Sequence, residues 1–220
     1  MRKLVFGAIL ALAAAALLIP AAASEPNSQR TWDVTITNLT PQGSQPLSAP
    51  LFVVHSKRAQ IWSPGEIATH PVAAIAEDAN NAPAESAFPK LPGVQGVFTG
   101  AGGAIPPGAS RRYRVQTSGQ FDRLSLLTML VNTNDGFTGL DSLQLRGNGT
   151  TLETLAYDAG SEINNELTAF IPGPCCNHPF VRDPEGDLIR MHEGITGRGD
   201  LDPAVYGWHG AVARIEIDRH

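Results

Sequence analysis

Cysteine is nearly absent from this 220-residue chain: there are two, Cys175 and Cys176, and they are adjacent. Neighbouring cysteines cannot cross-link distant parts of a fold. Three states of the pair remain open, namely a vicinal disulfide, an intermolecular disulfide and two thiols. A metal site shared with His178 is a weaker alternative, because zinc ligands are normally spaced more widely and a fourth ligand would be needed.

Charged residues make up only 17% of the chain and aromatic residues only 6%. The formal net charge is −5, and no basic run follows the spacing of a phosphate backbone. The composition therefore argues against a nucleic-acid partner. With so few aromatic side chains, we expect Trp32 and Trp208 inside the core. Trp62 is left open between the core and a ligand-binding surface.

Motifs of several enzyme classes are missing as well. The sequence has no Gly-x-Ser-x-Gly elbow, no His-Glu-x-x-His pair and no phosphate-binding loop. Its six histidines are scattered, so an acid–base or zinc site would form only if the fold gathered them beside carboxylates. The sequence favours a non-catalytic protein, with a secreted hydrolase carrying a His–carboxylate site as the alternative.

Long hydrophobic runs are confined to one segment near the N-terminus. Arg2 and Lys3 precede an apolar run at 4–19, and Pro20 and the small residues 21–24 follow. The run is short for a membrane-spanning helix, which needs about 20 residues, and the pattern is typical of a cleaved secretory signal peptide. We expect a signal peptide at 1–23 and a single domain at 24–220, secreted or periplasmic and without a later membrane segment.

Alternation of apolar and polar residues dominates the rest of the chain and predicts short β-strands separated by turns. The predicted strands are residues 32–39, 51–55, 112–117, 124–131, 140–145, 152–156, 188–192 and 212–217. About eight strands with one helical insert indicate an all-β fold, an antiparallel β-sandwich.

The helical insert is predicted from its start signals. Ser63-Pro64-Gly65-Glu66 has the spacing of a capping box with proline at the first helical position, so a short helix is expected to begin there. Pro71 then opens an alanine-rich stretch at 72–79, and 84–88 adds another turn. We expect these helices to form a crossover at one edge of the sheets.

Two acidic, glycine-containing turns carry the main functional signal. Asp135 and Asp141 lie in 132–143, and Asp158 and Glu162 lie in 157–162, each beside an apolar strand. Carboxylate and carbonyl oxygens are the ligands that calcium prefers, so the two turns could share one ion. The alternative is that these side chains only cap turns.

Several segments together resemble the spondin domain in its bacterial secreted form. They are residues 35–40, 45–50, 76–78, 125–135, 139–141, 194–197 and 208–217. The resemblance covers essentially all of the chain after the signal peptide. It implies a C2-like antiparallel β-sandwich that is exported, binds one calcium ion and serves extracellular adhesion or matrix contact in animal relatives.

The calcium ligands implied by the resemblance fall on Asp135, Asp141, Asp158 and Glu162. Glu162 stands where the family's Asp-Ala-Gly-Thr-Asp segment has its second aspartate. The disulfides that stitch the animal domains have no counterpart here. We therefore expect a monomeric calcium-binding module whose partner is an extracellular polymer or protein.

One tripeptide suggests a receptor ligand. Arg198-Gly199-Asp200 would present a guanidinium and a carboxylate to an integrin if it stood on an exposed loop. The flanking glycines and Asp202-Pro203 favour an ordinary long turn instead.

Overall fold

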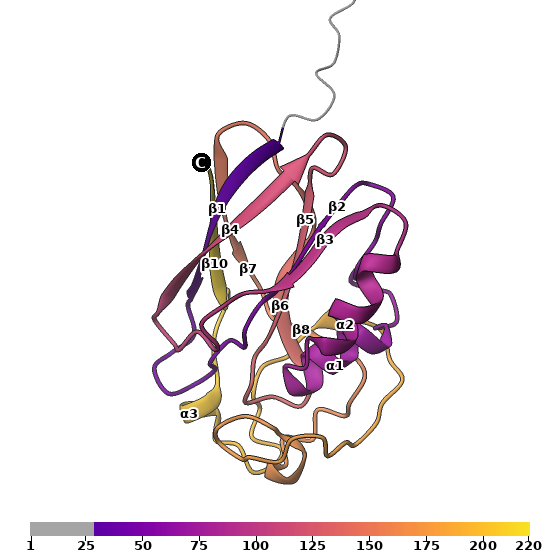
Figure 1. The fold of residues 1–220 in the computed structure, drawn as a ribbon. Coiled ribbons are helices and arrows are strands. Elements are labelled where there is room, and N and C mark those ends of the chain that lie inside the picture. The colour runs from indigo at the N-terminus through magenta and orange to yellow at the C-terminus, as the bar shows by residue number, and fades with distance from the viewer. Residues whose placement is uncertain (1–28) are drawn as a thin grey trace, which may run out of the picture.

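Two antiparallel β-sheets pack against each other in the computed structural model, which describes residues 29–220 (Figure 1). The four-stranded sheet has the order β4-β1-β10-β7, and the six-stranded sheet has the order β3-β2-β5-β6-β8-β9. This confirms the all-β sandwich. The expected signal peptide, residues 1–23, lies outside the described residues.

The first sheet follows the predicted alternation closely. Its strands are β1 (Gln29–Asn38), β4 (Ser110–Ser118), β7 (Gly149–Thr154) and β10 (Ala213–Arg219). Val34 of β1 is opposite Ile217 of β10, and both side chains are buried between the sheets. Trp32 and Trp208 belong to the same core, as predicted.

The second sheet is covered on both faces. Its strands are β2 (Leu51–His55), β3 (Val94–Thr99), β5 (Arg123–Met129), β6 (Gly136–Gln144), β8 (Tyr157–Asp158) and β9 (Arg190–Met191). Alternate residues of β2 point to opposite faces: Phe52 packs in the core between the sheets, and Val53 packs in a second core under the helices. Burial on both faces explains why 51–55 is apolar throughout.

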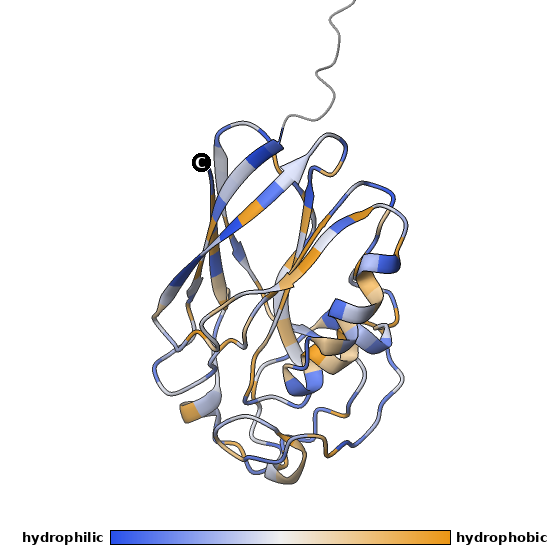
Figure 2. Ribbon diagram, viewed as in Figure 1, coloured by the Kyte–Doolittle hydropathy of each residue, from blue (hydrophilic) through white to orange (hydrophobic). Residues whose placement is uncertain are grey.

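The helices lie over the outer face of this sheet, so the expected crossover at a sheet edge is wrong. They are α1 (His70–Asp78), α2 (Ala82–Ala87) and the 3₁₀ turn η1 (Phe88–Lys90). Val72 and Ile75 of α1 pack against Leu127 of β5 and Phe137 of β6. Hydrophobic residues gather where α1 meets the sheet (Figure 2).

The short helix predicted to begin at Ser63 is not found in the described structure. Helix α1 begins at His70 and corresponds to the alanine-rich stretch at 72–79 that was predicted to follow Pro71. Residues 63–66 form a turn in which Gly65 has a φ of 86°, a left-handed conformation that does not continue a helix. The Ser63 hydroxyl donates to Asp141 instead of capping a helix. The predicted helix start at Ser63 is therefore wrong, because the Ser63 hydroxyl binds Asp141, a residue far away in the sequence.

Two strands escaped prediction, and one is shorter than predicted. β3 is an edge strand that is only partly buried and contains Gly96, so its alternation is weak. β8 has only two residues. β9 spans only Arg190–Met191 of the predicted 188–192.

The segment between β8 and β10 is mostly irregular and gathers at the lower end of the molecule in Figure 1. It contains the 3₁₀ turn η2 (Thr168–Phe170), the short helix α3 (Pro203–Tyr206) and a disulfide between Cys175 and Cys176. The vicinal disulfide is thus the state that the structure contains. Within residues 29–220, no helix combines the length and hydrophobicity that crossing a bilayer requires.

Candidate cation site

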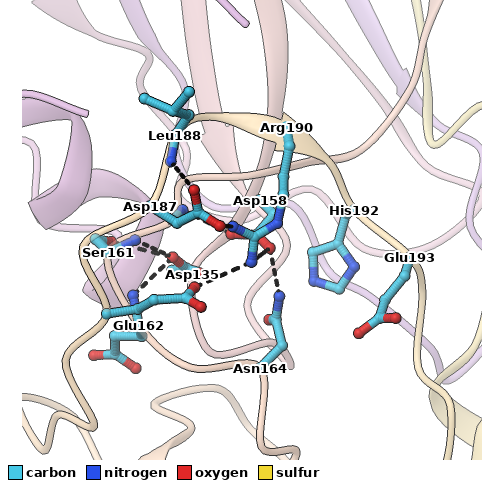
Figure 3. Close-up of polar contacts among 12 residues, drawn as sticks. Asp135, Asp158, Ser161, Glu162, Asn164, Asp187, Leu188, Arg190, His192 and Glu193 are labelled. Atoms are coloured by element: carbon cyan, nitrogen blue, oxygen red, sulfur yellow. Dashed lines mark hydrogen bonds and ion pairs between the residues drawn. The ribbon is translucent and has the colours of Figure 1, made fainter. Parts of the chain in front are cut away.

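Three of the four predicted acidic residues come together where the six-stranded sheet meets the loops. Asp135 immediately precedes β6, Asp158 lies in β8 opposite Gly136, and Glu162 follows four residues later. Their exposed fractions are 0% for Asp135, 2% for Asp158 and 1% for Glu162. Figure 3 shows the carboxylates of Asp135 and Asp158 in one polar cluster with Ser161 and Arg190.

The main chain after β8 wraps around the Asp135 carboxylate. Its Oδ2 atom accepts hydrogen bonds from the backbone N–H groups of Ser161 (2.8 Å) and Glu162 (3.0 Å) and from the Ser161 hydroxyl (3.2 Å). Its Oδ1 atom is buried and has no hydrogen-bond partner in the described part of the chain. One oxygen therefore organises the 159–162 turn, and the other is left available.

Asp158 is more fully engaged. Its Oδ1 atom accepts from the Gly160 N–H (2.7 Å), and its Oδ2 atom accepts from Asn164 Nδ2 (2.6 Å) and lies 2.8 Å from Arg190 Nη2. Arg190 is the residue opposite Asp158 in the pairing of β8 with β9, so the sheet register itself brings the guanidinium to the carboxylate.

Glu162 is the least satisfied of the three. Neither oxygen of its buried carboxylate makes a hydrogen bond within residues 29–220. Arg182 Nε lies 3.1 Å from Oε1, which is ion-pair distance without hydrogen-bond geometry, and the same guanidinium also pairs with Glu77 and Asp78 of α1. A single arginine is thus shared among three carboxylates.

Burial is the largest cause of the raised pKa values of all three groups. Burial, with the neighbouring Asp158 charge, raises the pKa of Asp135 to about 7 against the opposing hydrogen bonds from residues 161 and 162. Burial raises the pKa of Glu162 to about 9, with the charges of Glu77 and Asp135 adding to it. Burial also raises the pKa of Asp158, although Gly160 and Arg190 act in the opposite direction. The cluster therefore favours a bound proton or cation over three buried negative charges.

This predicts that the metal-free protein loses stability as the pH rises. A carboxyl group with a raised pKa contributes stability that is complete below its unfolded-state pKa and is lost as the pH rises through its folded-state pKa. For Glu162 that loss extends from its ordinary value of 4.5 up to about 9. Urea unfolding in chelator should give a free energy about 3 kcal/mol lower at about pH 9 than at about pH 6.5.

The control for this prediction is Glu162→Gln, which keeps the side chain neutral at every pH. Its free energy of unfolding should change less over the same pH interval. An unchanged pH dependence in the variant would show that Glu162 is not the titrating group.

Asp141 lies apart from the other three. It is five residues beyond Gly136 along β6, roughly 16 Å away at the rise of a strand. Its Oδ1 atom accepts from Gln60 Nε2 (2.7 Å), and its Oδ2 atom accepts from the Ser63 hydroxyl. Asp141 therefore fastens the 60–63 turn to β6, next to Trp62, whose indole N–H donates to the Leu140 carbonyl. Trp62 is buried, which places it in the second core.

In the described residues, no three His, Cys, Asp or Glu side chains converge closely enough to hold one metal ion between them. An ion at Asp135 and its neighbours would have to draw on main-chain, amide or water oxygens as well. Calcium sites normally combine such ligands.

Sequence reasoning missed the residues that complete the cluster. Arg182 and Arg190 supply its positive charge, and Asn164 donates an amide hydrogen bond to Asp158. The arginines lie in the irregular segment, far from the acidic turns in sequence. No local spacing could have revealed them.

Glu166 has a separate structural role, which is to hold the turn that leads into Arg198-Gly199-Asp200. Its buried carboxylate accepts hydrogen bonds from the N–H groups of Thr196, Gly197 and Arg198. Burial would raise its pKa, but these bonds outweigh burial and hold the pKa below its ordinary value. The carboxylate thus fixes the 196–198 turn.

The charged groups of the tripeptide are held in place within the molecule. Asp200 Oδ2 accepts from the Thr168 N–H (2.9 Å) and hydroxyl (3.0 Å), and the Arg198 guanidinium pairs with Glu193. A Cβ on Gly199 would lie 2.3 Å from the Asn165 carbonyl oxygen, so this backbone packs against the 165–168 segment. The geometry supports the long-turn interpretation over a receptor-presenting loop.

Two histidines bear on the hydrolase alternative. His55 Nε2 lies 2.8 Å from Ser125 Oγ, but both residues are fully buried and offer a substrate no access. Burial lowers the pKa of His192 to about 4 although the Glu166 charge opposes this, so its ring is neutral near pH 7. Its Nδ1 atom accepts the Gly194 N–H, and the ring stacks near Trp208 with centroids 5.2 Å apart. The contacts of His55 and His192 support structural roles for both histidines.

Comparison with known proteins adds a decisive match. The family model described as Spondin_N matches residues 35–166, which run from the end of β1 through β8 and include all four predicted acidic residues. The chain belongs to the spondin N-terminal domain family. Spondin domains form a family of extracellular, adhesion-type modules that are not enzymes. A search of curated proteins finds no significant match.

The matched region ends at Glu166, so Arg182 and Arg190 lie beyond it. The carboxylates of the cluster belong to the spondin segment, and the guanidinium groups that face them come from the irregular segment that follows.

Proposed function

We propose that this spondin-domain protein is an extracellular binding module stabilised by one calcium ion, which binds beside Asp135, Asp158 and Glu162. The three carboxylates do not converge closely enough to hold the ion by themselves, so water, amide or main-chain oxygens would complete its coordination. The observation that carries the proposal is the set of buried carboxylate oxygens without hydrogen-bond partners in the described chain, Asp135 Oδ1 and both oxygens of Glu162. Buried charged oxygens are costly unless a cation or donor compensates them.

The surrounding charge supports a divalent cation. Five further acidic side chains lie around the three carboxylates, and two arginines face them: the acids are Glu77, Asp78, Asp183, Glu185 and Asp187, and the bases are Arg182 and Arg190. A bound divalent ion would offset part of this excess. It would also lower the pKa values that burial now raises.

Hard oxygen donors favour calcium over a transition metal. The cluster offers carboxylates and the Asn164 amide, and no cysteine or histidine is among its hydrogen-bonding partners in the described residues. Asp135 Oδ1 and both oxygens of Glu162 accept no hydrogen bond in the described residues, although Glu162 Oε1 is paired with Arg182. Asp158 Oδ1 accepts one bond and keeps a second lone pair.

The ion's role in this proposal is to hold loops in place. Asp135 precedes β6, and Asp158 and Glu162 begin the long segment that runs to β10, so an ion between them ties the sheet to the loops at this end of the sandwich. Those loops would present the surface that contacts an extracellular polymer or protein. Because Arg198 and Asp200 are engaged within the molecule, the contact surface in this proposal does not use that tripeptide.

Thermal unfolding in chelator and in millimolar calcium tests the proposal. An ion that binds only the folded state stabilises it by about 3 kcal/mol when its concentration is roughly a hundred times Kd. For a domain of this size, the midpoint should rise by roughly 5–10 °C. Magnesium at the same concentration is the control, because it demands a smaller and more regular site and should raise the midpoint less. Equal midpoints in chelator and calcium would refute the calcium site.

A further inference from the structure

A cavity of about 550 Å³ lies at the end of the sandwich, beside the C-terminus of α1. One wall comes from the loops at residues 46 and 104–106 and from the chain that continues β5, with Met129 and Val131. The other wall comes from residues 172–174 and Asn177 of the disulfide turn, residues 172–177, and the two cysteines themselves do not line the cavity. The volume falls within the ~300–1,000 Å³ of typical small-molecule sites. None of the three proposed calcium ligands lines it.

The disulfide turn is fixed before any ligand arrives. The N–H groups of Cys176 and Asn177 both donate to the Gly173 carbonyl at 3.0 Å, and the Cys175 N–H donates to Asn132 Oδ1 at 3.1 Å. A Cβ on Gly173 would lie 1.8 Å from the Val131 carbonyl oxygen, so the turn sits directly on the opposite wall's backbone. A preformed wall reduces the ordering cost of binding.

The walls are almost entirely carbon, and the one ionisable lining residue is already neutralised. Asp78 Oδ1 accepts the Phe180 N–H at 2.9 Å, and its Oδ2 atom pairs with Arg182. The remaining lining side chains in the described structure are prolines, alanines, Met129, Val131 and Asn177, apart from Gly173. A charged ligand would find no free counter-charge here, so the chemistry selects an uncharged one.

The backbone around the cavity argues against an extended peptide. Peptides that dock as strands need unpaired N–H and carbonyl groups along an edge. Here the N–H groups of Cys175, Cys176 and Asn177 are used within the molecule, and so is the N–H of His178, which donates to the Ile171 carbonyl.

We propose that this cavity binds an uncharged small molecule with mainly hydrocarbon surface, and that the disulfide turn is its rigid wall. Such a ligand would gain affinity from apolar burial alone. Asn177, which lines the cavity, offers it a polar side chain.

N-phenyl-1-naphthylamine, an uncharged dye that fluoresces in apolar surroundings, is the probe for the test. It should bind saturably with one site per chain. The anionic analogue 8-anilinonaphthalene-1-sulfonate has the same ring system and should bind at least about tenfold more weakly. Saturable binding of both dyes with equal affinity would overturn the assignment to uncharged ligands, and no saturable binding of the uncharged dye would overturn the site.

A matched pair of variants tests whether the uncharged dye binds in this cavity. Ala104→Trp puts a large ring on the cavity wall from an exposed position, and it should weaken binding of the uncharged dye by about tenfold or more. Ala204→Trp makes the same change at an exposed position of α3, away from the cavity lining, and should leave binding unchanged. Near-UV circular dichroism checks that both variants fold. Equal affinity in the two folded variants would show that the dye binds elsewhere.

A double cysteine variant tests the role of the disulfide turn in dye binding. Replacing both cysteines by serine, as Cys175→Ser with Cys176→Ser, removes the disulfide but keeps the main-chain hydrogen bonds of the turn. The turn loses its covalent constraint, and dye binding should weaken several-fold. Unchanged affinity in this double variant would refute the disulfide turn as the rigid wall.

Discussion

Replacing Asp135 by asparagine should abolish the calcium-dependent rise in unfolding midpoint while leaving the metal-free protein as stable as before or more so. In chelator the Asp135 carboxyl has a pKa raised to about 7 by burial and by Asp158, so near pH 8 a neutral amide removes a buried charge. The asparagine oxygen can still accept the N–H groups of Ser161 and Glu162. With calcium, the loss should amount to about 3 kcal/mol, or roughly 5–10 °C in midpoint.

Asp141→Asn is the matched control, because it makes the same chemical change six residues further along the chain, within β6. Its carboxylate serves Gln60 and Ser63, so the variant should keep the full calcium-dependent rise even if its midpoint is lower in both buffers. If Asp141→Asn lost the calcium response and Asp135→Asn kept it, the three-residue site would be wrong.

Gly139→Ala should destabilise the protein by about 3–5 kcal/mol, the range reached when a core backbone is forced apart. Gly139 lies in the middle of β6, opposite Leu127 of β5. A Cβ at this position would lie 1.8 Å from the Leu126 carbonyl oxygen, so one strand must move away from the other. The midpoint of thermal unfolding should fall by roughly 10 °C or more.

Gly96→Ala is the control for the glycine prediction. Gly96 also lies in a strand, the edge strand β3, but a Cβ there would meet nothing within 4 Å. Its free energy of unfolding should stay within about 0.5 kcal/mol of the wild type. A Gly139→Ala variant as stable as Gly96→Ala would contradict the close approach of β5 and β6.

Strands with one buried face were the easiest part of the fold to predict. In β1 the burial of Val34 and Ile36 follows directly from the alternation of their neighbours, and 51–55 was predicted with the bounds that β2 has. The helix start was wrong because the Ser63 hydroxyl serves Asp141, a partner 78 residues away. The helices' position over a sheet face also depends on long-range packing, which local pattern does not encode.

The candidate site was predictable only in part. Asp135, Asp158 and Glu162 lie in glycine-containing turns, and the pairing of β6 with β8 then brings them together. Asp141 lies in the same glycine-containing acidic segment as Asp135, but it is five residues beyond Gly136 along β6 and so lies far from the cluster. The two arginines come from a segment with little regular structure, so neither periodicity nor spacing could place Arg182 or Arg190 beside the carboxylates.

Calorimetric titration of calcium into the metal-free protein at about pH 8 is the most direct test of the central claim, that a calcium ion binds beside Asp135, Asp158 and Glu162. One ion should bind per wild-type chain, none should bind to Asp135→Asn, and Asp141→Asn should bind one ion with nearly wild-type affinity. Absence of saturable binding to the wild type would contradict the account, as would unchanged binding in Asp135→Asn.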